Sequence, residues 1–302
     1  MLDLDALLDE LAESFKALSN GLIEAPRRQE VSVPDAGFLL TMPAYQQGRE
    51  IAVKLVSIFH GNERLSIPTH QALICLFDAH TGTPLAFIDG TAITALRTAG
   101  AAALSTRLLA RQESRVLAII GAGVQGRAHL DMLSRVRPFS EIRIASHNPA
   151  HAGQLAATDT RSRAIETIEE AVRGADVVCL CTSASKPVIR PDWLAPGTHI
   201  TSVGYAPPGG ELDPEIIAQS RLFVETRQAF EPPPAGCAEL AGLAPSIGTE
   251  LGEILLGQQP ARQSPTELTV YKAMGHACED MAAANLVYQR ARQDGVGQRV
   301  TL

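Results

Sequence analysis

The stretch Val116-Leu117-Ala118-Ile119-Ile120-Gly121-Ala122-Gly123-Val124-Gln125-Gly126 decides the fold of this chain. Its first five residues are continuously apolar, which is typical of a parallel strand buried on both faces. The glycines that follow have the spacing G-x-G-x-x-G. In this pattern Gly121 permits a tight turn, Gly123 lets the backbone approach a pyrophosphate, and Gly126 lets the next helix pack close to the strand. The N-terminus of that helix would then offer free N–H groups to an anion.

The residues around this stretch complete a βαβ unit. Residues 127–136 can form a helix, and residues 141–146 form the next apolar strand, so the unit has the length that dinucleotide binding requires. The α/β alternation then continues, which predicts a doubly wound sheet of at least five strands. The further helices and strands are expected near residues 166–172, 176–181, 199–203, 221–225, 249–256, 266–271 and 276–292.

The N-terminal part of the chain has a different texture. Apolar residues at helical spacing predict a helix over residues 4–18, and a long Ala/Leu-rich helix is expected over 91–110. Between these helices lie short apolar runs separated by turns, at residues 37–42, 51–59, 72–77 and 84–88. The last two runs read as a hairpin, so we predict a mainly antiparallel module here.

Length and composition limit the possible functions. With 302 residues the chain forms one large or two modest domains, and its net charge of −7 argues against nucleic acid or an anionic membrane surface as a partner. No apolar run has the length of a membrane span, and the first residues are acidic, unlike a signal peptide. The five cysteines contain no C-x-x-C pair and the histidines show no ligand spacing. We therefore expect a reduced, cytoplasmic protein without a metal site.

Several charged residues stand in apolar or turn-like surroundings. Lys54 interrupts a hydrophobic strand, where a lysine is costly unless it is paired or faces a cavity. An outward-facing strand lysine is the ordinary alternative. Arg97 can be a solvent-facing arginine that snorkels from its helix, and Arg28 a solvated loop charge. Glu279 and Asp280, near the start of the last helix, read most simply as solvated or capping charges.

A series of motifs nevertheless carries a resemblance. In chain order these are residues 29–45 with Met42-Pro43-Ala44-Tyr45, then Lys54-Leu55-Val56, Pro68-Thr69-His70-Gln71-Ala72, Asp89-Gly90 with Thr94-Ala95-Leu96-Arg97-Thr98-Ala99, the glycine motif, and Lys272-Ala273-Met274-Gly275 with Glu279-Asp280. Together they resemble the ornithine cyclodeaminase/mu-crystallin family over essentially the whole chain.

The resemblance implies a domain organisation and a class of activity. Residues 1–97 plus 276–302 would form an α+β domain for substrate binding and dimerisation, and a Rossmann domain of residues 98–275 would be inserted into it. The family acts on small α-amino or α-imino acids with a nicotinamide cofactor, and a homodimer is expected.

The resemblance also assigns roles to residues. Arg28, Lys54 and Arg97 would converge on the substrate beside the nicotinamide, as catalytic residues. Arginine holds a planar carboxylate bidentately, and a lysine flanked by arginines in a partly desolvated pocket should have a lowered pKa. Such a lysine could exchange a proton with the substrate nitrogen. The expected cofactor contacts are Thr98, Gly121, Gly123, Val124, Gln125, Gly126, Ser146, His147, Asn148, Thr182, Val203 and Gly275.

Position 206 is where the chain departs from part of the family. Cyclodeaminases and the related archaeal alanine dehydrogenases carry an aspartate two residues beyond the glycine that corresponds to Gly204, whereas this chain has Ala206. The ketimine-reductase branch is also not acidic there. We therefore predict reduction of a cyclic ketimine, either Δ1-pyrroline-2-carboxylate or Δ1-piperideine-2-carboxylate. The alternatives are an ornithine cyclodeaminase, an alanine-type dehydrogenase, and a non-catalytic protein that holds NADP(H).

The end of the second Rossmann strand predicts the cofactor. NAD-selective sites place an acidic residue there, where it bonds the ribose 2′-OH. Here the strand ends Ala145-Ser146-His147-Asn148, with no carboxylate to repel a 2′-phosphate. We expect NADP(H) to be preferred, with NAD(H) possible.

Overall fold

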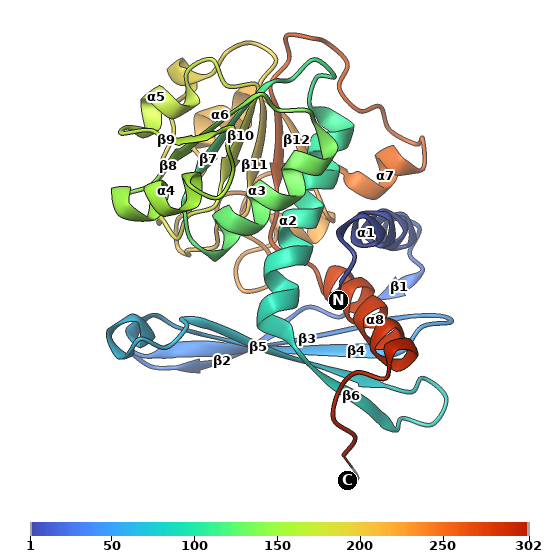
Figure 1. The fold of residues 1–302 in the computed structure, drawn as a ribbon. Helices are drawn as coiled ribbons and strands as arrows, with labels where there is room; N and C mark the ends of the chain where they lie inside the picture. The colour runs from blue at the N-terminus through green and yellow to red at the C-terminus, as the bar shows by residue number, and fades with distance from the viewer. Residues whose placement is uncertain (1, 301–302) are drawn as a thin grey trace. The chain divides into compact units, whose positions relative to one another are not determined.

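A computed structural model describes residues 2–300 of the chain. The chain divides into two compact units, one formed by residues up to Arg97 together with those from His276 onward, and the other by residues 98–275. Figure 1 labels the elements of both. No helix among the described residues has the length and apolar character to cross a membrane.

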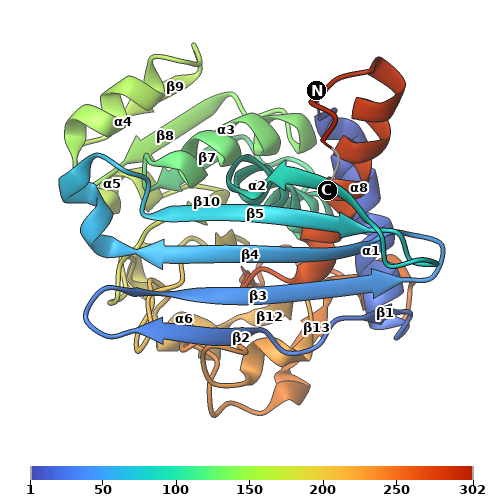
Figure 2. The same ribbon diagram turned by 90° about the horizontal axis from the view of Figure 1, so that it is seen from below.

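The first unit contains a six-stranded antiparallel sheet. Its order is β1-β3-β4-β5-β6, with β2 also paired to β3, and Figure 2 shows β2 to β5 side by side. A 3₁₀ helix, η1 (His60–Leu65), joins β4 to β5. The strands are β1 (Ile23–Glu24), β2 (Gln29–Val33), β3 (Gly37–Gln46), β4 (Ile51–Phe59), β5 (His70–Phe77) and β6 (Pro84–Asp89). The predicted hairpin is β5–β6, whereas β2 was not predicted, because only two of its five residues are apolar and all of its side chains are exposed.

Two helices cover one face of this sheet. Residues Leu40, Met42 and Ala44 of β3 are buried on that face, together with alternate residues of β4. Helix α8 (Ala277–Asp294) packs across β3, β4 and β5, and α1 (Leu4–Ser19) packs against α8 (Figure 1). The N-terminal helix is thus confirmed, and its buried apolar stripe lies against α8.

Helix α2 (Gly90–Leu109) begins in the first unit and continues into the second. Asp89 starts it, because its Oδ1 accepts hydrogen bonds from the N–H groups of Thr91 and Ala92. A side chain at Gly90 would collide with Ala72 of β5, so the helix begins close against the sheet. This start fixes where Arg97, seven residues on, can lie.

The second unit is a parallel sheet of eight strands in the order β13-β12-β14-β11-β10-β7-β8-β9. Because β8 lies on one side of β7 and β10 on the other, the strand order reverses between β7 and β10, which is where such sheets bind ligands. The strands are β7 (Val116–Ile120), β8 (Glu141–Ala145), β9 (Ser162–Ala164), β10 (Val177–Leu180), β11 (His199–Ser202), β12 (Arg221–Val224), β13 (Gly248–Glu250) and β14 (Thr269–Lys272). The helices are α3 (Val124–Val136), α4 (Pro149–Ala156), α5 (Ile168–Val172), α6 (Pro214–Gln219) and α7 (Leu251–Leu255), with short 3₁₀ turns η2 (Pro191–Trp193), η3 (Arg227–Phe230) and η4 (Pro245–Ile247).

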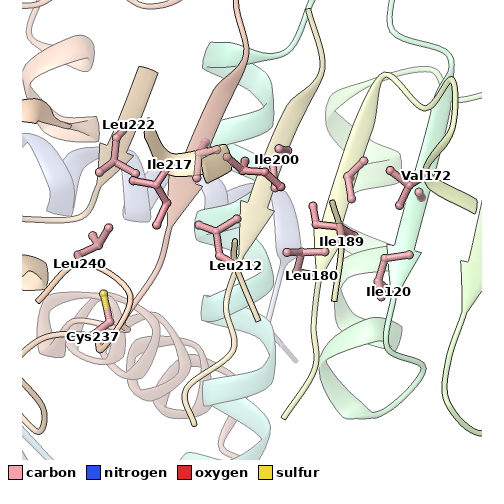
Figure 3. Packing of buried hydrophobic residues seen from close by; sticks show 14 of the residues in the cluster. Ile120, Val172, Leu180, Ile189, Ile200, Leu212, Ile217, Leu222, Cys237 and Leu240 are labelled. Carbon is pink, nitrogen blue, oxygen red and sulfur yellow. The ribbon is translucent and has the colours of Figure 1, made fainter. Parts of the chain in front are cut away.

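The core of the second unit follows from the parallel register. Ala118, Val178, Ile200, Val270 and Leu222 occupy one row across five neighbouring strands, so their side chains share a face of the sheet. All five belong to one buried cluster, and Figure 3 shows Ile200 and Leu222 within it, beside side chains from the loops and helices that cover this face. The predicted α/β class, with a Rossmann sheet and an antiparallel module, is confirmed.

The structure adds short elements that the sequence did not predict. These are α4, β9 and β13, each with too few residues to show a period. Cys179 of β10 is a buried core residue, whereas Cys181 lies beyond the end of β10 and is only half-buried.

Candidate active site

A buried cluster of four charged side chains lies in the first unit. Lys54 Nζ is 2.7 Å from Asp280 Oδ2, and Arg97 Nε is 3.0 Å from Asp280 Oδ1. Arg97 Nη1 is 3.2 Å from Glu279 Oε2. None of the four side chains is more than 5% exposed. Because two cations face two anions, each charge has a partner that offsets part of its desolvation cost.

Three elements bring these charges together. Lys54 lies in the middle of β4, on the buried face that α8 covers, and Arg97 lies two turns into α2. Glu279 and Asp280 occupy the first turn of α8, where negative charge is favoured by the helix dipole. Glu279 also forms a capping box, its Oε1 accepting from the His276 N–H at 2.7 Å.

The expectation of solvated charges at Glu279 and Asp280 was therefore wrong. Both are buried, because the first turn of α8 faces the sheet and pairs with Lys54 and Arg97. The capping alternative holds for Glu279. The solvent-facing alternatives for Lys54 and Arg97 are also wrong, since both side chains are buried and paired.

The buried cluster lowers the pKa of Lys54. Burial, reinforced by the positive charge of Arg97, lowers the pKa of Lys54 to about 8, although Asp280 partly opposes the shift. Burial would raise the pKa of Asp280, but the charges of Arg97 and Lys54 outweigh it and hold that pKa below its usual range. Lys54 is therefore an ammonium at neutral pH that can give up its proton at little cost.

Arg28 lies at the edge of the same region. Arg28 directly precedes β2, whose first residue Gln29 pairs with Thr41 of β3, close to the position where Met42 pairs with Lys54. Burial lowers the pKa of His276 to about 4, and the charge of Arg28 contributes to this shift. Arg28 is half-buried, and its predicted convergence with Lys54 and Arg97 remains a prediction.

His70 was missed as a candidate by reasoning from the sequence. It is half-buried on β5, and its pKa is lowered to about 4 by burial and then by the charges of Lys54 and Arg97. Its imidazole is therefore neutral at physiological pH and can accept or donate a hydrogen bond beside the cations. Its motif, Thr69-His70-Gln71-Ala72, was the only signal.

The glycine motif forms a tight turn in the second unit whose backbone could accommodate a phosphate. Gly121 has a φ of +106°, and a side chain there would collide with the Cys181 carbonyl. A side chain at Gly126 would collide with the Gly121 carbonyl, whereas nothing lies within 4 Å of where a Gly123 side chain would be. Helix α3 then starts without a side-chain cap, so its first N–H groups remain for an anion.

The neighbouring predicted contacts leave room for a nucleotide. Val124, at the start of α3, is 70% exposed, and Gln125 is half-buried. At the end of β8, His147 is exposed and Ser146 half-buried. Asn148 caps α4, its Oδ1 accepting from Ala150 N at 3.0 Å, and its side-chain NH₂ group is the donor that could reach a phosphate. The residues present fit a dinucleotide, and no carboxylate follows β8 at Ser146, His147 or Asn148.

The other predicted cofactor contacts lie after strands of the parallel sheet, except Thr98, which lies in α2. Thr182 and Val203 follow β10 and β11, next to the switch point. Thr98 is buried in α2. The Gly275 N–H donates to Glu225 Oε1 at 2.9 Å, so this group is already used within the protein. Glu225 and the buried Glu211, which binds Thr182, were not found from the sequence, because isolated glutamates carry no pattern.

The chain is similar to proteins of known activity. The model of the ornithine cyclodeaminase/mu-crystallin family matches residues 1–295. The ketimine reductase mu-crystallin of Mus musculus is 38% identical over 281 residues, covering 92% of this chain and 88% of that protein. The structure of Thermococcus litoralis Δ1-pyrroline-2-carboxylate reductase in complex with NADH and L-proline has a TM-score of 0.93 at 32% identity, covering 99% of this chain and 97% of that chain.

An archaeal alanine dehydrogenase dimer with bound NAD has a TM-score of 0.90 at 28% identity, and the match covers 100% of this chain and 95% of that chain. These likenesses extend over both units, and the motifs around Lys54, Arg97 and the glycine turn lie within the matched residues. The chain therefore belongs to the ornithine cyclodeaminase/mu-crystallin family.

Proposed function

We propose that this protein reduces a cyclic ketimine carboxylate, Δ1-pyrroline-2-carboxylate or Δ1-piperideine-2-carboxylate, to the cyclic amino acid. The observation that carries the proposal is the buried cluster in which Lys54, with a pKa of about 8, lies beside Arg97. The likeness to a ketimine reductase and to a reductase bound to NADH and L-proline supports it.

The first unit supplies the binding and proton chemistry. Arg97 and Arg28 would hold the substrate carboxylate through their guanidinium groups. Lys54 would donate a proton to the ring nitrogen, directly or through water, as the C=N bond becomes CH–NH. Asp280 holds Lys54 and Arg97 by one carboxylate and so fixes the distance between the proton donor and the carboxylate clamp.

The second unit would bind the nicotinamide cofactor, which supplies the hydride. Gly123 and the start of α3 would hold the pyrophosphate. We propose NADPH as the preferred form, with Ser146 and His147 at the 2′-phosphate, because no carboxylate lies there. NADH remains a possible donor.

We also propose that two copies associate through the outer face of the antiparallel sheet. Opposite the face covered by α8, the sheet exposes apolar side chains, among them Val31 (63%), Leu73 (40%) and Phe87 (60%). An apolar face of this kind is typical of a subunit interface. The likeness to an alanine dehydrogenase dimer supports a second copy as the occupant.

The experiment that tests the function is cofactor oxidation by the purified protein. NADPH and NADH are offered with a panel of cyclic imines and, separately, with 2-oxo acids and ammonia. Oxidation with the imines alone is expected. Turnover of 2-oxo acids with ammonia would instead select an amino-acid dehydrogenase, and silence throughout would select a binding protein.

A further inference from the structure

Glu211 forms hydrogen bonds to residues at the ends of two neighbouring strands, β10 and β11, in the second unit. Its side chain is fully buried, and its carboxylate accepts four hydrogen bonds. Oε2 accepts from Thr182 N at 2.8 Å and Thr182 Oγ1 at 2.6 Å, just beyond β10. Oε1 accepts from Ser202 Oγ at 3.0 Å and Gly204 N at 2.7 Å, at the end of β11. A carboxylate that accepts so many donors fixes their positions strongly.

Lys272 holds the same segment from the other side. Its Nζ donates to the Gly204 carbonyl at 2.8 Å, to Ser202 Oγ at 3.1 Å and to Glu239 Oε1 at 2.7 Å. Burial would lower the pKa of Lys272, but the charges of Glu239 and Glu211 raise it overall, so it stays an ammonium. The N–H and the C=O of Gly204 are thus each held by a buried charged group.

This anchor lies where the nicotinamide half of a dinucleotide belongs. In a doubly wound sheet the two nucleotides lie across the switch point at the carboxyl ends of the strands, one on each half. The glycine turn after β7 and the end of β8 belong to the half that takes the adenosine. The ends of β10 and β11, which Glu211 ties together, belong to the other half.

We propose that Glu211 is a positioning residue for the nicotinamide end of the cofactor. By holding Thr182 and Gly204 it fixes the strand ends on which the ring and its ribose would rest, and it sets the direction in which Tyr205 and Ala206 leave β11. Lys272 and Glu239 complete the anchor. This inference rests on the proposed use of NADPH, but not on the identity of the imine.

Glu211→Gln is the variant that tests it. The amide keeps the size of the side chain but turns an NH₂ group toward the N–H groups that now donate to the carboxylate. Asp176→Asn is the matched control, because Asp176 accepts from Arg115 N at 2.7 Å and Val116 N at 3.0 Å at the opposite, amino-terminal edge of the same sheet. Two ligands are titrated, NADPH and 2′-phospho-ADP-ribose, which lacks the nicotinamide ring.

We expect Glu211→Gln to bind NADPH about tenfold more weakly while its affinity for 2′-phospho-ADP-ribose stays within about twofold of the parent. Asp176→Asn should leave the affinities for NADPH and for 2′-phospho-ADP-ribose unchanged, even if it lowers the melting temperature. If Glu211→Gln does not fold, Ser202→Ala removes the hydroxyl shared by Glu211 and Lys272 and should show a smaller loss for NADPH alone.

Equal losses for both ligands, unchanged NADPH binding, or the same pattern in Asp176→Asn would overturn the proposal. A parent protein that bound no NADPH would overturn it as well. A parent protein that bound NADPH but reduced no imine would refute only the proposed reaction, and the comparison of the two ligands would still test Glu211.

Discussion

Lys54 sets the pH dependence expected of the reaction. Its pKa is lowered to about 8, so it carries a proton below that pH and loses it above. Reduction of the imine needs the protonated form, and therefore kcat/KM should fall by about tenfold per pH unit above the pKa. Oxidation of the cyclic amino acid needs the free amine and should rise until about pH 8. Profiles of kcat/KM against pH, recorded in both directions, measure this, and Lys54→Met should lack the fall above about pH 8. If the fall persisted in Lys54→Met, Lys54 would not be the group that transfers the proton.

Asp280→Asn should shift the fall of kcat/KM for imine reduction to lower pH. The negative charge of Asp280 raises the pKa of Lys54, so its removal lowers the pKa further below 8. At pH 7 the variant should lose about tenfold or more in kcat/KM, because less Lys54 is protonated and Arg97 is held less firmly.

Glu279→Gln is the matched control for Asp280→Asn. Glu279 contacts Arg97 but not Lys54 in any described ion pair, and its influence on the Lys54 pKa is the weakest of the contributing charges. In Glu279→Gln the fall of kcat/KM should shift in pH by less than it does in Asp280→Asn. If the fall of kcat/KM in Asp280→Asn began at the same pH as in the parent, the Asp280 carboxylate would not determine the pKa of Lys54.

Only some of the residues of the candidate site could be identified from the sequence. Lys54 and Arg97 stood out as cations in apolar elements, yet only the resemblance gave them a role. Glu279 and Asp280 looked like ordinary first-turn acids, because nothing local shows that the helix end faces a lysine on a distant strand. Glu211 bonds to Thr182, 29 residues away, and no spacing rule predicts that contact.

Elements with a strong pattern were predicted and short ones were not. The continuous apolar run of β7 and its three glycines predicted the strand, the turn and the start of α3. Strand β2 has only two apolar residues, Val31 and Val33, and β9 has only three residues in all, so neither is long enough to establish a period. Each is held by pairing with a longer neighbour, β2 with β3 and β9 with β8, and this pairing leaves no mark on the strand's own residues.

The end of β8 should determine the choice of cofactor. We expect a higher kcat/KM with NADPH than with NADH. His147→Asp should reverse the order by about tenfold, because a carboxylate there would repel a 2′-phosphate and bond a ribose hydroxyl. Steady-state rates with both cofactors measure this, and His151→Asp, on α4, is the control. Equal or better use of NADH by the parent would reject the prediction.

The loop after β11 should prevent conversion of ornithine to proline. That reaction needs a carboxylate to deprotonate and orient the δ-amino group, and Ala206 cannot do either. Asp213 is engaged elsewhere, since it caps α6 by accepting from Glu215 N at 2.7 Å. Enzyme with NADP⁺ and L-ornithine should release almost no ammonia or proline, and Ala206→Asp should release more. Release by the parent at a rate comparable with imine reduction would contradict this.

Local sequence patterns could not predict how the elements of the whole chain are arranged. The first unit is made of two segments separated by the entire second unit, and α8 (Ala277–Asp294) covers strands β3, β4 and β5, which all lie between residues 37 and 77. Periodicity predicted the strands and the last helix separately. It could not show that they pack together, because which apolar face covers which is decided by packing across the whole unit.

The outer face of the antiparallel sheet should hold two copies together. Leu73 is 40% exposed there and lies opposite Asp89 in the register, so Leu73→Lys places a charge at the interface without setting like charges side by side. Burying a lysine in an apolar interface is costly even with a carboxylate beside it, because both charges lose their hydration, so the variant should shift to the monomer mass in light scattering at micromolar concentration. Leu243→Lys is the matched control, since Leu243 is 39% exposed but belongs to the second unit. The control should stay dimeric. A monomeric parent, or a loss of the dimer in both variants, would show that this face is not the contact.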